Sequence, residues 1–365
     1  MAGIYIHIPF CKQACHYCNF HFATSLLYKN ELLEALLKEM EIQKNYLGNE
    51  PVESIYIGGG TPSLCTGEEL QTLVQTIHQL FDVNKDAEIT LETNPDDITE
   101  PALKAWKTLG INRLSIGIQS FFEEDLRWMN RAHNASQAAA ALQLATSYFN
   151  NITIDLIYGF PLLSNEKWKE NVQKVIASGI PHISSYALTV EPKTPLDKMI
   201  RAHRVENVDP DKQSEQFLLL MQWMEEAGYE HYEISNFSKP GWKSRHNSSY
   251  WKGKKYLGIG PSAHSFDTVS RQWNISNNQL YISSIKKNEL PYEKEILTET
   301  QKLNEYIMIS LRTMEGTDLG IAGNELLEKC RKWLESGHMK LVNRSLVLTS
   351  EGKLLADGIA ADLFF

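Results

Sequence analysis

The feature that most constrains the fold is a regular alternation of strand-like and helix-like segments over the first 235 residues. Between the strand-like runs, apolar residues recur every three or four positions, as expected for amphipathic helices. Repeated strand–helix units predict parallel strands joined by right-handed crossovers, in a doubly wound sheet or a barrel. The strand-like runs are 3–8, 54–57, 88–93, 113–118, 151–158 and 182–188, with a less regular run at 230–235, and clear helical stripes fall within 30–47, 67–81 and 211–228.

The alternation ends near residue 236, and this divides the chain into three predicted parts. Residues 1–235 form the α/β part. Residues 236–290 are rich in Ser, Asn, Gly, Lys and aromatic residues, which predicts loops and short strands in a connecting region. Residues 291–365 predict a smaller α+β, winged-helix-like domain, with helices at 298–312, 323–336 and 350–364 and a strand–turn–strand at 339–348.

Composition restricts the classes of function. The chain has 45 acidic and 36 basic residues and a net charge of −9, which argues against binding nucleic acid through bulk charge. No apolar run approaches the ~20 residues of a membrane span. The first residues lack the basic region of a signal peptide, and five cysteines in a chain of this length do not suggest a disulfide scaffold. We therefore expect a cytoplasmic protein.

Three of the cysteines, Cys11, Cys15 and Cys18, form a C-x3-C-x2-C motif directly after the first predicted strand. The carboxyl ends of strands are where α/β proteins build their active sites. Three thiolates can hold three irons of a [4Fe–4S] cube and leave the fourth iron open to another ligand. The alternative is a zinc site, whose fourth ligand would be a histidine at position 7, 16 or 21.

A glycine-rich loop follows the second strand. Gly58, Gly59 and Gly60 precede Thr61 and Pro62. Without side chains, the backbone N–H groups of such a loop can meet a carboxylate or an amino group. A tight turn between strand and helix is the simpler interpretation of this motif by itself.

The later strands carry polar residues toward their carboxyl ends. These are Glu92, Gln119 and Asp155, and Arg131 lies in a loop between the last two strands concerned. A polar residue inside a parallel strand is costly unless it has a partner. One such residue would suggest a satisfied hydrogen bond, whereas three at corresponding positions favour a shared ligand site.

The motifs YIHIPFC, GGGTPS, ETNP, IGIQSF, NRAH and DLIYGFP occur in this order and resemble those of the oxygen-independent coproporphyrinogen III oxidase-like radical S-adenosylmethionine (SAM) family. The resemblance covers at least residues 5–161. It implies an α/β fold with a partial (β/α)6 barrel, a [4Fe–4S] cluster on the three cysteines, and SAM on the open iron. By the same resemblance, Tyr5, Gly59 and Glu92 would contact that SAM. Positions that bind a second SAM in the decarboxylating oxidase are matched by Tyr17, Gly60, Thr61, Gln119, Arg131 and Asp155.

Two subgroups share these motifs. The oxidase typically has another cysteine two positions after the third, where this chain has Phe20. The HemW-type heme chaperone subgroup is similar in ending the motif with Phe and in having an H-N-x-x-Y-W motif, which is His246 to Trp251 here. The resemblance implies that His246 ligates heme iron while Tyr250 and Trp251 pack nearby, and imidazole and aromatic rings suit both roles.

The segment around this motif is locally basic. Residues 236–256 contain six cations and no acidic residue, and heme carries two propionates that Arg and Lys pair with well. An exposed histidine without a ligand, or a loop that binds RNA or an anionic membrane, remains an alternative. The cations are Lys239, Lys243, Arg245, Lys252, Lys254 and Lys255.

Together these features predict a heme chaperone of the radical SAM type, with no catalytic residue assigned. It would hold a [4Fe–4S] cluster, SAM and heme, and would transfer heme to acceptor proteins such as respiratory enzymes. No nucleic acid is expected as a partner, and peripheral membrane association and a homodimer are compatible with this role. The alternative is an oxygen-independent coproporphyrinogen III oxidase of porphyrin biosynthesis. A third class is a radical SAM enzyme with another substrate.

Overall fold

The computed structural model describes residues 2–365, whose main feature is a twelve-stranded sheet. Six central strands run parallel in the order of the sequence, which confirms the predicted strand–helix units. The two edge strands of the sheet do not pair with each other, so the barrel is partial. The central strands are β1 (Ala2–Ile8), β2 (Val52–Gly59), β3 (Val83–Thr93), β4 (Arg113–Gln119), β5 (Ile152–Tyr158) and β6 (His182–Ala187).

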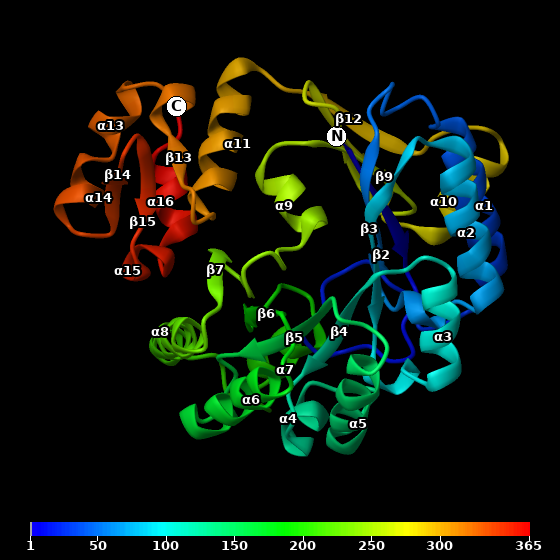
Figure 1. Cartoon of the computed structure of the whole chain (residues 1–365), viewed down its shortest axis with the longest axis horizontal. Helices are drawn as coiled ribbons and strands as arrows, with labels where there is room; N and C mark the ends of the chain where they lie inside the picture. Colours follow the sequence, from blue (N-terminus) through cyan, green and yellow to red (C-terminus); the bar gives the residue numbers. More distant parts are fainter. Residues whose placement is uncertain (1) are drawn as a thin grey trace.

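Helices cover the outer face of this curved sheet (Figure 1). The predicted helix at 30–47 is shorter in the structure and ends at Ile42. Gly110 and Gly228 have positive φ angles just after α3 and α8, as is typical of C′ residues. The helices of the α/β part are α1 (Lys29–Ile42), α2 (Gly67–Leu80), α3 (Glu100–Thr108), α4 (Glu123–Trp128), α5 (Ala135–Thr146), α6 (Asn165–Ala177), α7 (Pro195–Arg201) and α8 (Pro210–Glu226).

The two faces of the central strands differ in polarity. Alternate residues such as Ile55, Leu91 and Ile116 are fully buried in the main apolar core, whereas the residues between them line a cavity inside the barrel. Successive side chains on a strand point to opposite faces, and parallel strands are usually apolar on both. The polar inner face therefore marks the barrel interior as a binding region.

The connecting region predicted at 236–290 adds strands to both edges of the sheet. β8 pairs with β6, and β9 lies parallel to β1, next to the antiparallel strands β10 and β11. The run predicted at 230–235 forms β7 (Glu230–Glu233), which pairs antiparallel with β8 and so is not a seventh parallel unit. The added elements are β8 (Asn236–Ser238), α9 (Arg245–Trp251), β9 (Lys255–Ile259), β10 (His264–Phe266), β11 (Ser270–Asn274), α10 (Asn278–Lys286) and β12 (Tyr292–Ile296).

The C-terminal part has its own apolar core and a three-stranded sheet of order β13-β15-β14. The helix predicted at 323–336 is divided into two short helices at Cys330. Across residues 2–365, no helix is both long enough and apolar enough to cross a membrane. The elements are α11 (Glu299–Leu311), β13 (Thr317–Asp318), α12 (Leu319–Ala322), α13 (Glu325–Lys329), α14 (Arg331–Glu335), β14 (Met339–Val342), β15 (Ser345–Leu348), α15 (Ser350–Lys353) and α16 (Ala356–Asp362).

Candidate functional site

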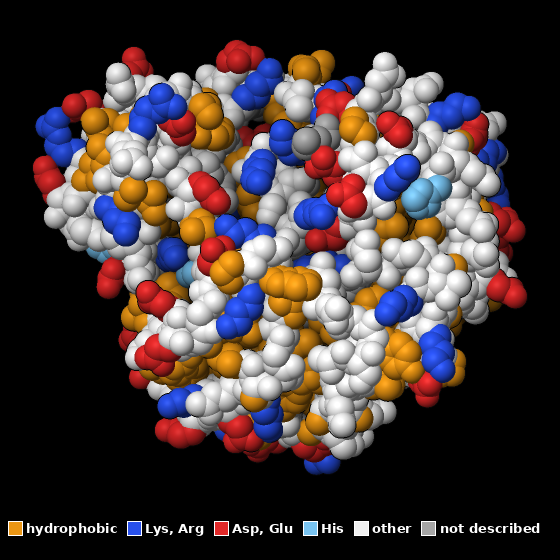
Figure 2. All heavy atoms as spheres, viewed as in Figure 1, with side chains coloured by type: hydrophobic (Ala, Val, Ile, Leu, Met, Phe, Trp, Pro, Cys, Tyr) orange, Lys and Arg blue, Asp and Glu red, His pale blue; other side chains and the backbone are white. Residues whose placement is uncertain are grey.

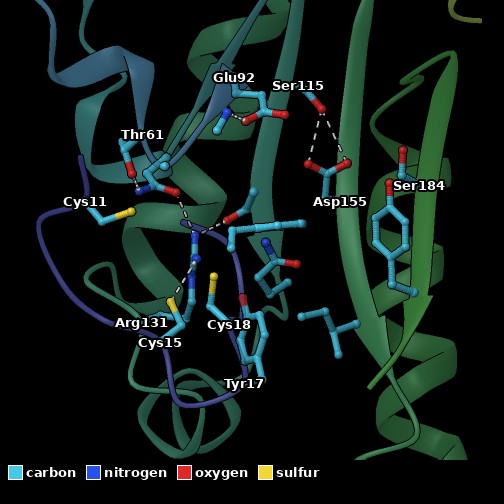
Figure 3. A pocket seen from close by; sticks show the side chains of 18 of the residues that line it. Cys11, Cys15, Tyr17, Cys18, Thr61, Glu92, Ser115, Arg131, Asp155 and Ser184 are labelled. Atoms are coloured by element: carbon cyan, nitrogen blue, oxygen red, sulfur yellow. Dashed lines mark hydrogen bonds between the residues drawn. The ribbon is translucent and has the colours of Figure 1, made fainter. Parts of the chain in front are cut away.

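A cavity of about 440 Å³ occupies the interior of the barrel. One end is formed by the loop after β1, which carries the three cysteines, and the walls are the inner faces of β2 to β6. Figure 3 shows the cysteine side chains at one end of the cavity, with Asp155 and Ser184 toward the other side. The structure thus brings together these predicted site residues: Cys11, Cys15, Tyr17, Cys18, Gly59, Gly60, Thr61, Glu92, Gln119, Arg131 and Asp155.

The cysteines are free thiols and are partly exposed to the cavity. Burial raises the pKa of Cys11 to about 11 and also raises the pKa of Cys18, so iron would have to displace their protons on binding. Among residues 2–365, no three His, Cys, Asp or Glu side chains are close enough to hold a single metal ion. A [4Fe–4S] cube places its thiolates on different irons, and the three-cysteine loop suits that wider arrangement better than a tetrahedral zinc.

Arg131 connects the cysteine loop to the barrel. Its guanidinium group lies 3.4 Å from Cys15 Sγ and donates hydrogen bonds to Asn94 Oδ1 at 2.8 Å and to the Gly117 carbonyl at 2.7 Å. The fixed positive charge lies beside the thiols, where it would stabilise thiolates. Arg131 is therefore placed to hold the cysteine loop against β3 and β4.

The glycine loop has a packing role that the sequence did not indicate. A Cβ atom on Gly60 would lie 2.6 Å from the Phe10 carbonyl oxygen, and one on Gly59 would lie 2.7 Å from the His7 ring. The Gly59 N–H donates to Glu92 Oε2 at 3.0 Å, and the Gly60 N–H donates to the Ile8 carbonyl. These two amides are therefore used inside the protein, and the glycines allow β2 to approach the cysteine loop closely.

Glu92 and Asp155 are carboxyl groups on the inner face of the barrel. Tyr56 donates a hydrogen bond to Glu92 Oε1 at 2.8 Å, and Ser115 lies 3.2 Å from one Asp155 oxygen. Burial raises the pKa of Glu92 to about 7 and that of Asp155 to about 6. Both groups can therefore gain or lose a proton near neutral pH, and each can accept hydrogen bonds from a ligand when ionised.

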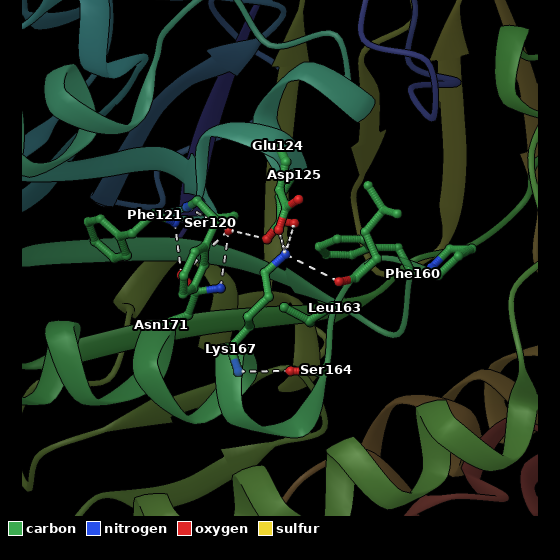
Figure 4. Close-up of polar contacts among 12 residues, drawn as sticks. Ser120, Phe121, Glu124, Asp125, Phe160, Leu163, Ser164, Lys167 and Asn171 are labelled. Carbon is green, nitrogen blue, oxygen red and sulfur yellow. Dashed lines mark hydrogen bonds and ion pairs between the residues drawn. The ribbon is translucent and has the colours of Figure 1, made fainter.

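Gln119 lies at the end of β4 with a φ of 66°, which is unusual for a residue other than glycine. The loop that follows is held by a buried polar cluster (Figure 4). Ser120 donates to Asp125 at 2.7 Å, and the Asp125 carboxylate also pairs with Lys167 at 2.5 Å. Asn171 accepts the Phe121 N–H and donates to Ser120. This cluster fixes the loop that turns Gln119 toward the cavity.

One predicted residue does not line the cavity. Tyr5 points its hydroxyl group to His7 Nδ1 at 3.0 Å, and its ring lies 6.0 Å from that of Tyr56. Sequence reasoning missed several inner-face residues that do line it. The signal was available, because these residues follow a two-residue alternation along each strand; they are Tyr56, Arg113, Ser115, Thr153, Ser184 and Tyr186.

The H-N-x-x-Y-W segment forms α9, which contacts β1, β2 and α11 and appears between the main sheet and the C-terminal part in Figure 1. Asn247 reaches the cavity, whereas His246 is 1% exposed behind it. Burial lowers the pKa of His246 to about 3. Tyr250 and Trp251 are half-buried, and the Arg312 guanidinium lies 5.4 Å from the Trp251 ring centre.

Glu88 holds the start of α9 from the neighbouring strand β3. Its carboxylate accepts the backbone N–H groups of Arg245 and His246 at 3.1 and 3.0 Å. A negative charge at a helix N-terminus satisfies otherwise unpaired amides. The heme motif is thus anchored to the barrel by a side chain more than 150 residues away in the sequence.

The basic loop is largely neutralised by acidic residues from other segments. Lys243 lies 3.4 Å from Glu230, and Lys255 lies 3.0 Å from Glu50. Lys252 and Lys254 are exposed, and Figure 2 shows basic and acidic side chains interspersed over one face of the molecule. The predicted basic patch is therefore smaller than residues 236–256 suggest, because the sequence window omits the acidic residues that fold against it.

A partial barrel with three cysteines on the loop after its first strand defines a radical SAM protein. The model of the radical SAM superfamily matches residues 5–175. The chain is 33% identical to the heme chaperone HemW of Mycobacterium tuberculosis over 99% of this chain and 94% of the relative. It is 32% identical to HemW of Bacillus subtilis over 98% of both proteins. The chain therefore belongs to the HemW family of radical SAM proteins.

Among solved structures, the oxygen-independent coproporphyrinogen III oxidase HemN of Escherichia coli superposes with a TM-score of 0.85. The match covers 100% of this chain and 90% of the oxidase at 21% identity. A likeness at this identity shows that the two proteins share a fold over their whole length, including the added strands and the C-terminal part.

Proposed function

We propose that the protein is a heme chaperone, which binds heme and passes it to heme-requiring acceptor proteins. The observation that supports this most strongly is the full-length similarity to curated heme chaperones at 32–33% identity. The cysteine-lined cavity supports the part of the proposal that concerns a [4Fe–4S] cluster and SAM.

In this proposal Cys11, Cys15 and Cys18 hold the cluster. When bound, such a cluster supplies an open iron that can chelate the amino and carboxylate groups of SAM. Tyr5 and Gly59 would shape the site around that ligand, and Glu92 would accept a hydrogen bond from its amino group. The remaining cavity residues would contact either this SAM or a second one: Tyr17, Gly60, Thr61, Gln119, Arg131 and Asp155.

His246 is the proposed axial ligand of heme iron. Because it is buried and its ring nitrogens are hydrogen bonded to Ser54 and Tyr250, α9 has to rearrange before iron can reach it. Tyr250 and Trp251 are half-buried beside it and can cover the porphyrin face. The exposed Lys252 and Lys254 follow directly and can pair with propionates.

The acceptors, the location and the assembly also belong to the proposal. Five free cysteines agree with a reducing compartment such as the cytoplasm. We propose that the acceptors include respiratory enzymes, which implies transient contact with a membrane surface, and that the protein works as a homodimer. Size-exclusion chromatography with light scattering tests the assembly.

A heme titration of anaerobically reconstituted protein tests the main proposal. We expect a stable Soret band and no decarboxylation of coproporphyrinogen III in the presence of SAM and a reductant. Protoporphyrinogen formation would favour the oxidase instead, which shares the fold. RNA binding without a Soret band would favour a radical SAM enzyme with another substrate.

The variant His246→Ala tests the proposed ligand. It should weaken heme binding at least tenfold while iron and acid-labile sulfide contents stay unchanged, because His246 lies outside the cysteine loop. His264→Ala is a matched control, since this histidine lies on β10 away from α9. Equal heme affinity in the two variants would remove His246 from the heme site.

A further inference from the structure

The His246 ring lies between two hydroxyl groups. Ser54 Oγ on β2 lies 2.8 Å from Nδ1, and the Tyr250 hydroxyl, one helical turn along α9, lies 2.8 Å from Nε2. Gly3 leaves space for the ring, since a Cβ atom there would lie 3.3 Å from His246 Cε1. The imidazole is therefore held on both nitrogens before any iron arrives.

The directions of these two hydrogen bonds follow from the acidity of the partners. A neutral imidazole has one N–H donor and one lone pair. The phenol of Tyr is a far stronger acid than the alcohol of Ser, and burial keeps the Tyr250 hydroxyl protonated by raising its pKa. Tyr250 therefore donates to Nε2, and His246 Nδ1–H donates to Ser54. This is the tautomer in which Nε2 can bind a metal.

We propose, on the basis of the heme-ligand role assigned to His246 above, that Ser54 is a positioning residue that sets the ligating tautomer and that Tyr250 is a gate that occupies Nε2 until heme iron replaces it. Ser54 thus plays the part that outer partners play for metal-binding histidines. In the exchange, the O–H···N hydrogen bond breaks and an Fe–N bond forms. Tyr250 keeps its proton, so no acid, base or oxidant is required.

The surroundings of Tyr250 permit this movement. Its ring is half-buried and packs edge-on against His246 at 5.0 Å and against Tyr256 at 4.6 Å between ring centres. The Ser54 side comes from a central strand of the sheet and is 2% exposed. The fixed partner is therefore on the Nδ1 side, and the mobile partner is on the side where iron would bind.

Heme titrations of two variants test the gate. Ser54→Ala should weaken heme binding about tenfold, because the ligating tautomer is no longer favoured. Tyr250→Phe should tighten it about fivefold, because one hydrogen bond of about 1 kcal/mol no longer competes with iron. Changes of opposite sign on the two sides of one ring are not expected from a purely structural role.

Matched controls are available for both changes. The Ser238 hydroxyl is buried and has no hydrogen-bond partner among the described residues, and Tyr256 packs on Tyr250 without a bond to His246. Ser238→Ala and Tyr256→Phe should leave heme affinity within twofold of the unchanged protein. Weaker binding in both Ser54→Ala and Tyr250→Phe would overturn the gate.

A second measurement does not depend on the variants folding. Nitrogen NMR of heme-free protein with labelled histidine should find His246 protonated at Nδ1 and unprotonated at Nε2. The opposite tautomer would overturn the assignment of Ser54. If His246→Ala binds heme normally, the proposed heme ligand fails, whereas if it loses heme but the tautomer or the signs above are wrong, only the gate fails.

Discussion

Glu92 is buried in the barrel, and its carboxyl group accepts hydrogen bonds from the Tyr56 hydroxyl and the Gly59 amide. Burial raises its pKa to about 7, so the group is mostly protonated below this pH and mostly ionised above it. Only the ionised form is a strong acceptor for an amino group. A residue that is fully charged in an unfolded chain thus becomes sensitive to pH at the site.

The proposed contact between Glu92 and SAM therefore predicts a pH-dependent loss of affinity in Glu92→Gln. At pH 8 the variant should bind SAM about tenfold more weakly, as expected for loss of a charge-assisted hydrogen bond of ~1.5–3 kcal/mol. The ratio of the two affinities should fall toward one as the pH is lowered through about 7. Anaerobic equilibrium dialysis measures both.

Glu100→Gln provides the control, because Glu100 is exposed on α3 and pairs with Lys104. It should bind SAM like the unchanged protein at every pH. A ratio for Glu92→Gln that stays constant between about pH 5.5 and 8 would show that ionisation of Glu92 does not contribute to binding.

At the scale of elements, the added strands depend on a single buried carboxylate. Glu39 on α1 is fully buried and accepts hydrogen bonds from the Tyr281 hydroxyl at 2.5 Å, the Asn274 amide at 2.7 Å and the Gly260 N–H at 2.8 Å. These donors come from α10, from β11 and from the turn after β9. Glu39 thus joins the first helix to a segment more than 200 residues later.

Glu39→Ala should lower the free energy of unfolding by about 3 kcal/mol, because it leaves buried donors without an acceptor. Chemical denaturation measures this loss. Glu41→Ala on the same helix removes an exposed carboxylate that pairs with Lys44, and it should change stability by less than about 0.5 kcal/mol. Similar losses in the two variants would contradict the role of Glu39 as a connection between elements.

At the scale of the whole molecule, Arg312 joins three parts of the structure. Its guanidinium group lies 3.5 Å from the buried Glu233 at the end of β7, 2.8 Å from Asp357 on α16, and over the Trp251 ring on α9. The C-terminal part is therefore docked against the sheet and against the proposed heme helix by the same side chain.

Arg312→Ala should destabilise the protein by about 2 kcal/mol, since Glu233 would keep a buried charge without its partner. Hydrogen exchange should also become faster in α9 and β7, because both lose a contact to the C-terminal part. Arg331→Ala removes an exposed pair with Glu328 in the same part of the chain and should leave the exchange of α9 unchanged. Equal exchange in both variants would contradict this docking role.

Much of the fold could be predicted because its signals are local. The spacing of apolar residues gives helices and strands, and parallel order follows from their alternation. The cysteine motif and the polar strand ends could be predicted as one site for the same reason, since parallel strands bring their carboxyl ends to one edge. Their common cavity in the structure agrees with that expectation.

The sequence by itself determined the six central strands, the cysteine loop and the polar strand ends, because each depends on residues that are neighbours along the chain. Only the tertiary structure decided that β9 lies beside β1, that acidic residues neutralise the basic loop, and that Ser54 and Tyr250 hold His246. These features join segments up to two hundred residues apart. Such pairs are selected by shape and hydrogen bonding in the folded protein, and no local periodicity records them.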